Sequence, residues 1–324
     1  MAMQLKPRKW LRNMGVAMVS WLGSYAPVAH AESASPQSEL EGLVARLASS
    51  ESAYTDIVEG TQKSILWHDG IRKTPLSLVY IHGFSASARE LSPVTENLAE
   101  KLGANIYFAR LKGHGRSGEA MTEASVDDWL EDTREAWQIG QQIGEQVVVI
   151  SASTGGTLAT WLAAQENAQT MLANILVSPN FGIASRSGEI IRWDWGLTLA
   201  RWINGPTRGF TPQNKLHELY WTEEYPIEAL RPMIQIVDQV VDQDHSITRV
   251  PHLMVYSPKD HVIRVDRIED LSAQMSNAEV ELHPFTSATD PAQHVLAGEA
   301  CSPETTDEMV DLMYRYITAI LEQE

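Results

Sequence analysis

The chain has 324 residues, of which 44% are hydrophobic and 21% charged, and its formal net charge is −17. That length and apolar content exclude a disordered or fibrous protein and suffice for one large α/β domain or two ordinary ones. The acidic balance argues against nucleic acid as a partner and against strong binding to anionic membranes. The single cysteine, Cys301, cannot form an internal disulfide, and no Cys/His cluster predicts structural zinc.

Residues 1–31 have the composition of a secretory signal peptide. Four basic residues in MAMQLKPRKWLRN precede an apolar stretch at 14–28, and the segment ends in Ala29-His30-Ala31. This order predicts cleavage after Ala31 and export to the periplasm or the medium. An uncleaved N-terminal membrane anchor is the alternative, although the apolar stretch is shorter than the roughly 20 residues that a membrane span needs.

Strands and helices are predicted to alternate along the rest of the chain. Residues 77–81 (SLVYI) and 147–150 (VVVI) are continuous apolar runs, typical of strands buried on both faces. Ser125 and Asp128 have the spacing of a capping box at a helix start. The pattern predicts an α/β fold, with a mostly parallel central sheet flanked by helices and functional residues at the carboxyl ends of its strands. Strands are expected at 64–67, 77–81, 105–111, 147–150, 173–177, 253–256 and 280–285, and helices at 35–50, 91–102, 125–144, 155–165, 265–275 and 305–321.

The alternation is interrupted at 181–250, where no strand run is found. A connection of about 70 residues rarely lacks a role in a compact domain, so we interpret it as a helical cap inserted over the strand ends. It would separate a first core part, 32–180, from a second, 251–324. Its apolar side chains pack its own helices, line an acyl pocket or present a lipid-facing rim. Its tryptophans are Trp193, Trp195, Trp202 and Trp221.

The strand at 147–150 runs into the sequence SASTGG and then into a helix of small residues. This resembles the nucleophile elbow Gly-x-Ser-x-Gly, a strained strand-to-helix turn that exposes a serine hydroxyl. Ser151 stands at the first Gly position, and it and Gly155 are small enough for the two backbones to approach closely. Ser153 is therefore the predicted nucleophile. Taken alone, the stretch is also compatible with an ordinary Ser-rich loop.

An acid and a base follow Ser153 in the order that the elbow requires. The strand at 253–256 runs into Ser257-Pro258-Lys259-Asp260, which places a carboxylate just past a strand end. The strand at 280–285 leads to His294 on the loop before the last helix. Asp260 and His294 are the predicted acid and base. The weaker alternatives for the acid are Asp290, which could instead orient the loop of His294, and Asp242 and Asp244.

Backbone amides for a developing oxyanion are predicted next to Ser153. The strand at 77–81 ends in His82-Gly83-Phe84, so the N–H groups of Phe84 and Thr154 can point into the space above Ser153. His82 and His114 lack the spacing of zinc-enzyme motifs, and we expect them to make structural hydrogen bonds. No metal and no organic cofactor is expected.

Together these motifs resemble the α/β-hydrolase superfamily, within it the serine esterase and monoacylglycerol-lipase-like branch. The resemblance covers about 60–321 and implies a triad of Ser153, Asp260 and His294, backbone oxyanion donors at Phe84 and Thr154, and a lid formed by the insertion. Ser151 and Ser257 stand where these proteins commonly have Gly, which leaves substrate detail open. The motifs are HGF at 82–84, LKGHGRS at 111–117, SASTGG at 151–156, SPKDHVI at 257–263 and QHVLAG at 293–298.

The expected activity is hydrolysis of small apolar carboxylic esters through an acyl-enzyme on Ser153. Peptide, lactone and peracid chemistry uses the same triad and stays open, as does a non-catalytic binding protein of this fold. Acyl chain length, alcohol group and oligomeric state are not predicted.

Overall fold

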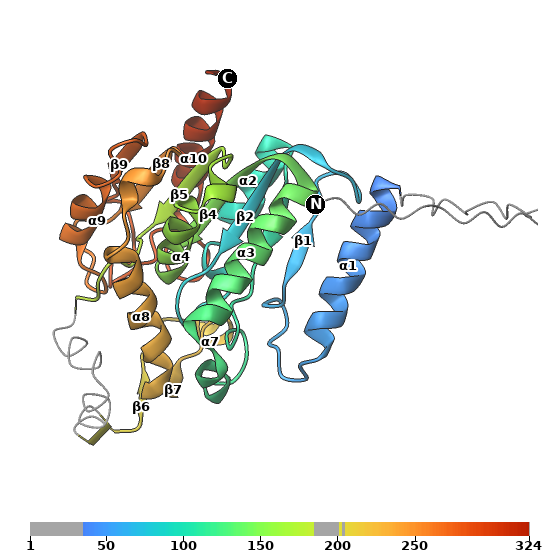
Figure 1. Ribbon diagram of the computed structural model, residues 1–324. Coiled ribbons are helices and arrows are strands. Elements are labelled where there is room, and N and C mark those ends of the chain that lie inside the picture. The colour runs from blue at the N-terminus through green and yellow to red at the C-terminus, as the bar shows by residue number, and fades with distance from the viewer. Residues whose placement is uncertain (1–34, 185–200, 203–204, 324) are drawn as a thin grey trace, which may run out of the picture. The chain divides into compact units, whose positions relative to one another are not determined.

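The computed structural model describes residues 35–184, 201–202 and 205–323, which contain a seven-stranded sheet (Figure 1). Its strands are β1 (Ser64–Leu66), β2 (Thr74–Ile81), β3 (Asn105–Phe108), β4 (Gly144–Ala152), β5 (Ala173–Val177), β8 (His252–Tyr256) and β9 (Val280–Pro284). The spatial order is β1-β3-β2-β4-β5-β8-β9. Only β1 runs antiparallel to its neighbour in this sheet, so the predicted mostly parallel sheet is confirmed. The segment 1–31 and Trp193 and Trp195 lie outside the described residues.

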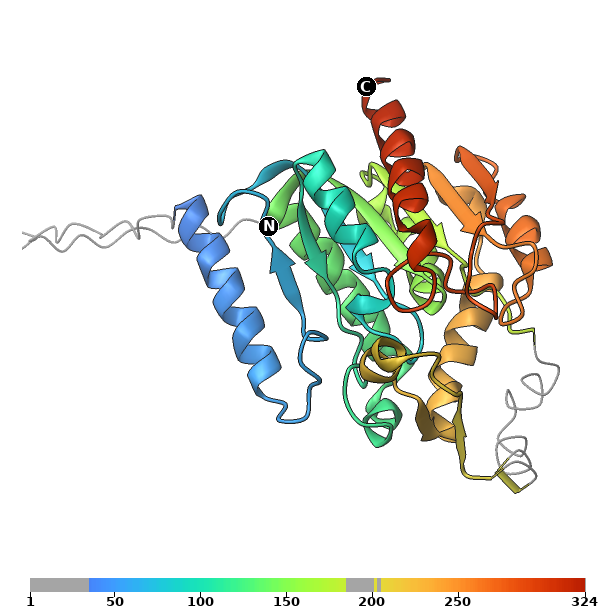
Figure 2. The ribbon, with the colours of Figure 1, turned by 180° about the vertical axis from the view of Figure 1, so that it is seen from behind.

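Helices cover both faces of the sheet. Side chains of α1, α3, α4, α8 and α9 join one hydrophobic core, and those of α2 and α10 join the other. In Figure 1 the ribbons of α3 and α8 lie in front of the sheet, and in the reverse view of Figure 2 the ribbon of α10 does. The sheet therefore lies between two apolar layers. The helices are α1 (Pro36–Ser52), α2 (Val94–Leu102), α3 (Val126–Ile143), α4 (Thr154–Ala163), α8 (Leu230–Val241), α9 (Val265–Ser272) and α10 (Thr306–Leu321).

The central strands alternate between these two cores residue by residue. In β2, Val79 and Ile81 pack with α3 and α4, whereas Leu78 and Tyr80 pack on the side of α2 and α10. Strand β4 alternates in the same way. Because both faces are covered, most side chains of such a strand are apolar, which explains the continuous apolar runs of the sequence.

The helix boundaries follow local signals. At the start of α3, the Ser125 hydroxyl accepts the Asp128 amide at 3.3 Å and the Asp128 carboxylate accepts the Ser125 amide at 2.9 Å, which confirms the predicted capping box. The helix expected at 91–102 begins only at Val94. A 3-10 turn, η1 (Ala88–Glu90), and then Pro93 precede it, and proline disfavours the helical conformation of the residue before it.

The described part of the insertion is not purely helical. It contains α7 (Lys215–Tyr220) and two short antiparallel strands, β6 (Thr207–Gly209) and β7 (Glu224–Pro226). The expectation that 181–250 holds no strand is therefore wrong, because strands of three residues are too short to leave a periodic pattern. Trp221 is buried, whereas Trp202 is 84% exposed.

The last helix of the insertion, α8, belongs to the packing of the sheet. It contacts α4 and α3, and its buried side chains join the core on their side. Within the described ranges, no helix has both the length and the apolar character to cross a bilayer.

Candidate active site

Ser153 lies on a sharp turn between β4 and α4. Its backbone has φ 48° and ψ −115°, a conformation that non-glycine residues rarely adopt, and its N–H donates to Val177 O at 3.0 Å. The turn is tight because α4 begins against the end of β2. A Cβ on Gly155 would overlap the carbonyl oxygen of Ile81 and lie 2.7 Å from that of His82. This packing keeps the turn in its strained conformation.

The two serines that depart from the family pattern both fit their positions. Ser151 is fully buried in β4, and its hydroxyl reaches Ile175 O on the neighbouring strand only at 3.4 Å. Ser257 donates to the Gln293 side chain at 3.1 Å and accepts the Lys259 amide at 3.2 Å. Ser257 therefore connects the loop after β8 to the loop after β9.

The structure brings Ser153, His294 and Asp260 together in one hydrogen-bonded chain. The Ser153 hydroxyl donates to His294 Nε2 at 3.0 Å, and His294 Nδ1 donates to Asp260 Oδ2 at 2.7 Å. The Asp260 side chain is fully buried, and its other oxygen accepts the amides of Val262 (2.7 Å) and Ile263 (3.1 Å). Both carboxylate oxygens are thus occupied, which fixes the ring orientation and tautomer of His294.

Polar contacts also hold the loop that carries His294. Asp290 is buried and accepts the backbone amides of His294 at 2.9 Å and Val295 at 3.0 Å. Its second oxygen accepts the Gln213 side chain of the insertion at 2.7 Å. The Ser178 hydroxyl donates to the His294 carbonyl at 2.7 Å. Asp290 therefore orients the loop, while Asp260 contacts the imidazole.

The charges around His294 change its pKa. Burial of the ring works to lower the pKa, but the hydrogen bond and charge of Asp260, with the charges of Glu90 and Asp290, raise it above the ordinary value of 6.5. The protonated imidazole that forms when a serine gives up its proton is therefore stabilised in place.

The backbone amides of Phe84 and Thr154 lie next to Ser153. Neither has a hydrogen-bond acceptor among the described residues. Thr154 is the first residue of α4, where helical N–H groups lack an internal acceptor. The loop of Phe84 adjoins the serine, because a Cβ on Gly83 would lie 3.0 Å from Ser153 Cβ. Both amides can donate to an oxyanion formed at Ser153.

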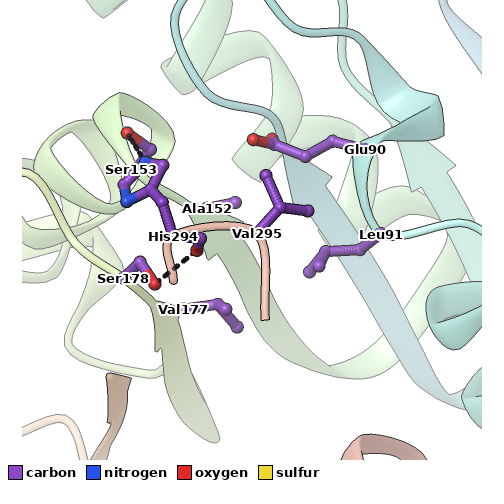
Figure 3. Close-up of a pocket in the computed structure, with 8 residues that line it drawn as sticks. All are labelled: Glu90, Leu91, Ala152, Ser153, Val177, Ser178, His294 and Val295. Atoms are coloured by element: carbon purple, nitrogen blue, oxygen red, sulfur yellow. Dashed lines mark hydrogen bonds between the residues drawn. The ribbon is translucent and has the colours of Figure 1, made fainter. Parts of the chain in front are cut away.

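A small pocket opens beside Ser153 (Figure 3). Most of its wall is apolar, and Glu90 and Ser178 add polar groups. The lining residues are Glu90, Leu91, Ala152, Ser153, Val177, Ser178, His294 and Val295.

Several residues of the site were not expected from the sequence. Glu90 and Ser178 line the pocket, and Gln293 connects the two loops. In the described part of the chain, the non-glycine residues with positive φ are Ser85, Ser153, Ser178 and Gln293, all on loops at this site. Such backbone strain clusters at functional sites, but a serine or glutamine in a sequence gives no sign of it.

The two histidines in the neighbouring loops make structural contacts, as expected. His82 donates from Nδ1 to Gly83 O at 2.8 Å and accepts the Leu111 amide at Nε2 at 3.1 Å. Burial lowers its pKa to about 4, so the ring is neutral. His114 packs against the rings of His82 and Phe84.

The remaining candidates lie outside the site or are inert. Asp242 and Asp244 are exposed around the end of α8. Cys301 is buried, and burial, with nearby acidic charges, raises the pKa of its thiol to about 12. Over the ranges that the structure describes, no three His, Cys, Asp or Glu side chains are grouped to hold a metal ion.

The packing at Gly155 leads to a stability prediction. Gly155→Ala should lower the free energy of unfolding by about 3 kcal/mol or more, because the added methyl group meets two carbonyl oxygens that cannot move without shifting β2. Urea unfolding followed by circular dichroism measures the change. Gly42→Ala in α1 is the matched control: its methyl group meets only the Arg46 guanidinium, at 3.4 Å, so stability should stay the same or rise by up to about 1 kcal/mol. Equal stabilities of the two variants would contradict this account.

Comparison with known proteins places the chain in a family. Residues 73–289 match the Hydrolase_4 family, described as serine aminopeptidase, S33. A thermostable monoacylglycerol lipase of Bacillus sp. (strain H-257) is 33% identical over 89 residues, which are 28% of this chain and 35% of that enzyme. The match thus spans about a third of the length of that relative.

Solved structures share the fold at low sequence identity. The structure described for the metagenome-derived lipolytic enzymes LipS and LipT superposes with a TM-score of 0.67 at 16% identity, over 81% of this chain and 99% of the other. Monoglyceride lipase of Saccharomyces cerevisiae gives 0.58 at 12% identity, over 81% and 93%. Monoacylglycerol lipase of Paleococcus ferrophilus gives 0.56 at 12%, over 80% and 98%. These likenesses show the α/β-hydrolase fold, and the family match covers most of the chain. The chain therefore belongs to the Hydrolase_4 (serine aminopeptidase, S33) family of α/β hydrolases.

Proposed function

We propose that the protein is a serine hydrolase that cleaves small carboxylic esters through an acyl-enzyme on Ser153. The observation that carries this proposal is the hydrogen-bonded chain from Asp260 through His294 to Ser153, at the mouth of a pocket with a mostly apolar wall. A nucleophile, a base and a residue that orients the base are the parts that acyl transfer requires.

The geometry accounts for both halves of the reaction. His294 Nε2 takes the proton of the Ser153 hydroxyl as the oxygen attacks the ester carbonyl, and the amides of Phe84 and Thr154 donate to the oxyanion. His294 then gives the proton to the leaving alkoxide, so that an alcohol departs and an acyl-enzyme remains. Water repeats the sequence and releases the acid. Asp260 keeps Nδ1 protonated throughout, so that Nε2 is free to accept.

The pocket and the relatives support an apolar acyl or alcohol group. Four of the residues that line the pocket beside the nucleophile are aliphatic: Leu91, Ala152, Val177 and Val295. The Bacillus relative is by name a lipase for monoacylglycerols, which are esters.

Hydrolysis of aminoacyl amides is the second candidate, because the family is described as serine aminopeptidase. The same relay of side chains serves ester and amide cleavage. A panel of p-nitrophenyl esters and aminoacyl p-nitroanilides separates the two candidates. Higher kcat/KM on the anilides would move the assignment to peptidase chemistry.

Removal of the nucleophile should abolish activity. Ser153→Ala should lower kcat on p-nitrophenyl butyrate by roughly a thousandfold or more, since no acyl-enzyme can form. Ser151→Ala, two residues away and also buried, is the matched control and should keep kcat within about tenfold of wild type. Wild-type hydrolysis that survives in Ser153→Ala would refute the proposed nucleophile.

The pH dependence of kcat/KM should reflect the titration of His294. Protonated His294 cannot accept the Ser153 proton, so kcat/KM should fall as the pH drops through the pKa of this residue, which lies above its ordinary value of 6.5. Because Asp260 helps to raise that pKa, Asp260→Asn should move the acid limb to lower pH and lower kcat by roughly 10⁴-fold. A profile that is flat between pH 5 and 8, a range that spans the titration of an ordinary histidine, would contradict the assignment of the base.

We also propose that the chain is exported and loses residues 1–31. This proposal rests on the order of charged, apolar and small residues in that segment. N-terminal sequencing of the protein isolated from its native host should give a start at Glu32. A chain that still begins at Met1 in the membrane fraction would favour the anchor instead.

A further inference from the structure

The mechanism above leaves one buried acidic side chain of the pocket without a role. Glu90, at the end of η1, is only 4% exposed and lines the pocket together with Ser153 and His294. Its carboxylate points toward the side of the pocket where those two residues lie (Figure 3). Burying a carboxylate costs free energy unless it is hydrogen-bonded. The hydrogen-bond partners of Glu90 therefore indicate what this side chain does.

The carboxylate of Glu90 binds the loop that carries the oxyanion donor. Its Oε2 accepts the Gly83 amide at 2.7 Å and the Tyr80 hydroxyl at 3.0 Å. On the other side of the same residue, the Gly83 carbonyl accepts His82 Nδ1–H at 2.8 Å. Glu90 and His82 thus hold Gly83 at both of its polar groups. The peptide that joins Gly83 to Phe84 is planar, so the hydrogen bond to the Gly83 carbonyl also sets the direction of the Phe84 N–H.

The space around Gly83 leaves no room for a side chain at this position. A Cβ at this position would lie 2.9 Å from Glu90 Oε1 and 3.0 Å from Ser153 Cβ. The carboxylate, the glycine and the nucleophile are therefore packed against one another, and a shift of Glu90 would be transmitted directly to the oxyanion loop.

No basic side chain pairs with the Glu90 carboxylate in the described residues. The neighbouring Arg89 pairs with Glu96 at 3.5 Å and lies over the Tyr220 ring. The other titratable groups that interact with Glu90 are the Tyr80 hydroxyl, the Cys301 thiol and His294. Of these three, only His294 can become positive.

The acidic groups that act on His294 come from three loops. Asp260 binds its Nδ1, Asp290 lies on its own loop, and Glu90 acts from η1. Asp260 and Asp290 each accept backbone amides as well as their other contacts. A charge on Glu90 adds to theirs in a site from which water is largely excluded, where electrostatic interactions are strong.

We propose that Glu90 is a positioning residue of this active site: through Gly83 it fixes the Phe84 amide that receives the oxyanion, and its charge stabilises protonated His294 during each proton transfer. This proposal rests on the proposed function, since it assigns Glu90 to the same reaction. Burial raises the pKa of Glu90, and the Gly83 amide, the charge of His294 and the Tyr80 hydroxyl oppose that rise by favouring the carboxylate.

Two substitutions separate the two effects. Glu90→Gln keeps an oxygen that can accept the Gly83 amide but removes the charge. The His294 ring should then titrate at lower pH, the acid limb of kcat/KM should move to lower pH, and kcat should stay within about tenfold of wild type. Glu90→Ala removes the acceptor as well. It should lower kcat by roughly 10- to 100-fold with a much smaller change in KM, since the oxyanion donor acts in the transition state.

The matched control is Glu96→Gln, which removes a nearby negative charge that does not line the pocket. It should leave the acid limb where it is in wild type. NMR of protein with isotope-labelled histidine, with the His294 signal assigned from a His294→Asn spectrum, measures the ring titration independently of activity. Circular dichroism confirms that each variant is folded.

The outcomes distinguish this proposal from the proposed function. An unchanged His294 titration in Glu90→Gln overturns the role of the charge, and wild-type kcat in a folded Glu90→Ala overturns the positioning. If Glu90→Ala does not fold, Glu90→Met, which fills similar space without an oxygen to accept the Gly83 amide, tests the positioning in its place. If wild-type protein hydrolyses no ester or amide, the proposed function fails, and the NMR titration still tests whether Glu90 acts on His294.

Discussion

The contact between the start of α4 and the end of β2 at Gly155 is the constraint on which the rest of the site depends. Because the two backbones approach so closely, the chain between β4 and α4 must turn within one residue, and Ser153 takes a φ of 48°. That conformation projects the hydroxyl away from both elements toward His294. It also leaves the Thr154 amide at the open N-terminus of α4, so one turn supplies both the proposed nucleophile and a proposed oxyanion donor.

The parallel order of the sheet then assembles the other groups at the same edge. Strands β2, β4, β5, β8 and β9 are neighbours or near neighbours, and their carboxyl ends carry Phe84, Ser153, Ser178, Asp260 and His294. These groups are held by further polar contacts. Asp260 accepts two backbone amides besides the imidazole, and the His294 loop is fixed by Asp290 and Ser178. A relay whose members are held in this way needs little reorganisation when charge develops.

The sequence predicted those features that local chemistry determines. Continuous apolar runs in β2 and β4 follow from burial on both faces, and the capping box at Ser125 follows from side chains three residues apart. Asp260 and His294 are predictable because each follows a strand of a parallel sheet, and the structure brings both to Ser153. Ser151 stands at the first glycine position of the elbow, and its burial between neighbouring strands shows that a hydroxyl fits there.

The features that the sequence did not predict depend on long-range contacts. Charged residues are usually exposed, so nothing in the sequence indicates that Glu90 is buried against Gly83 and the pocket. The role of Asp290 depends on amides and a side chain that only the folded loop brings to it. Strands β6 and β7 are stabilised by pairing with each other, and no apolar pattern marks them in the sequence.

The central claim is that Ser153 carries the acyl group. Mass spectrometry of the protein after rapid acid quench of its reaction with p-nitrophenyl acetate tests this most directly. We expect one acetyl group on the peptide that contains Ser153, present during turnover and lost when the substrate is consumed. An acetyl group on a different residue, or steady ester hydrolysis with no adduct at any quench time, would contradict the account.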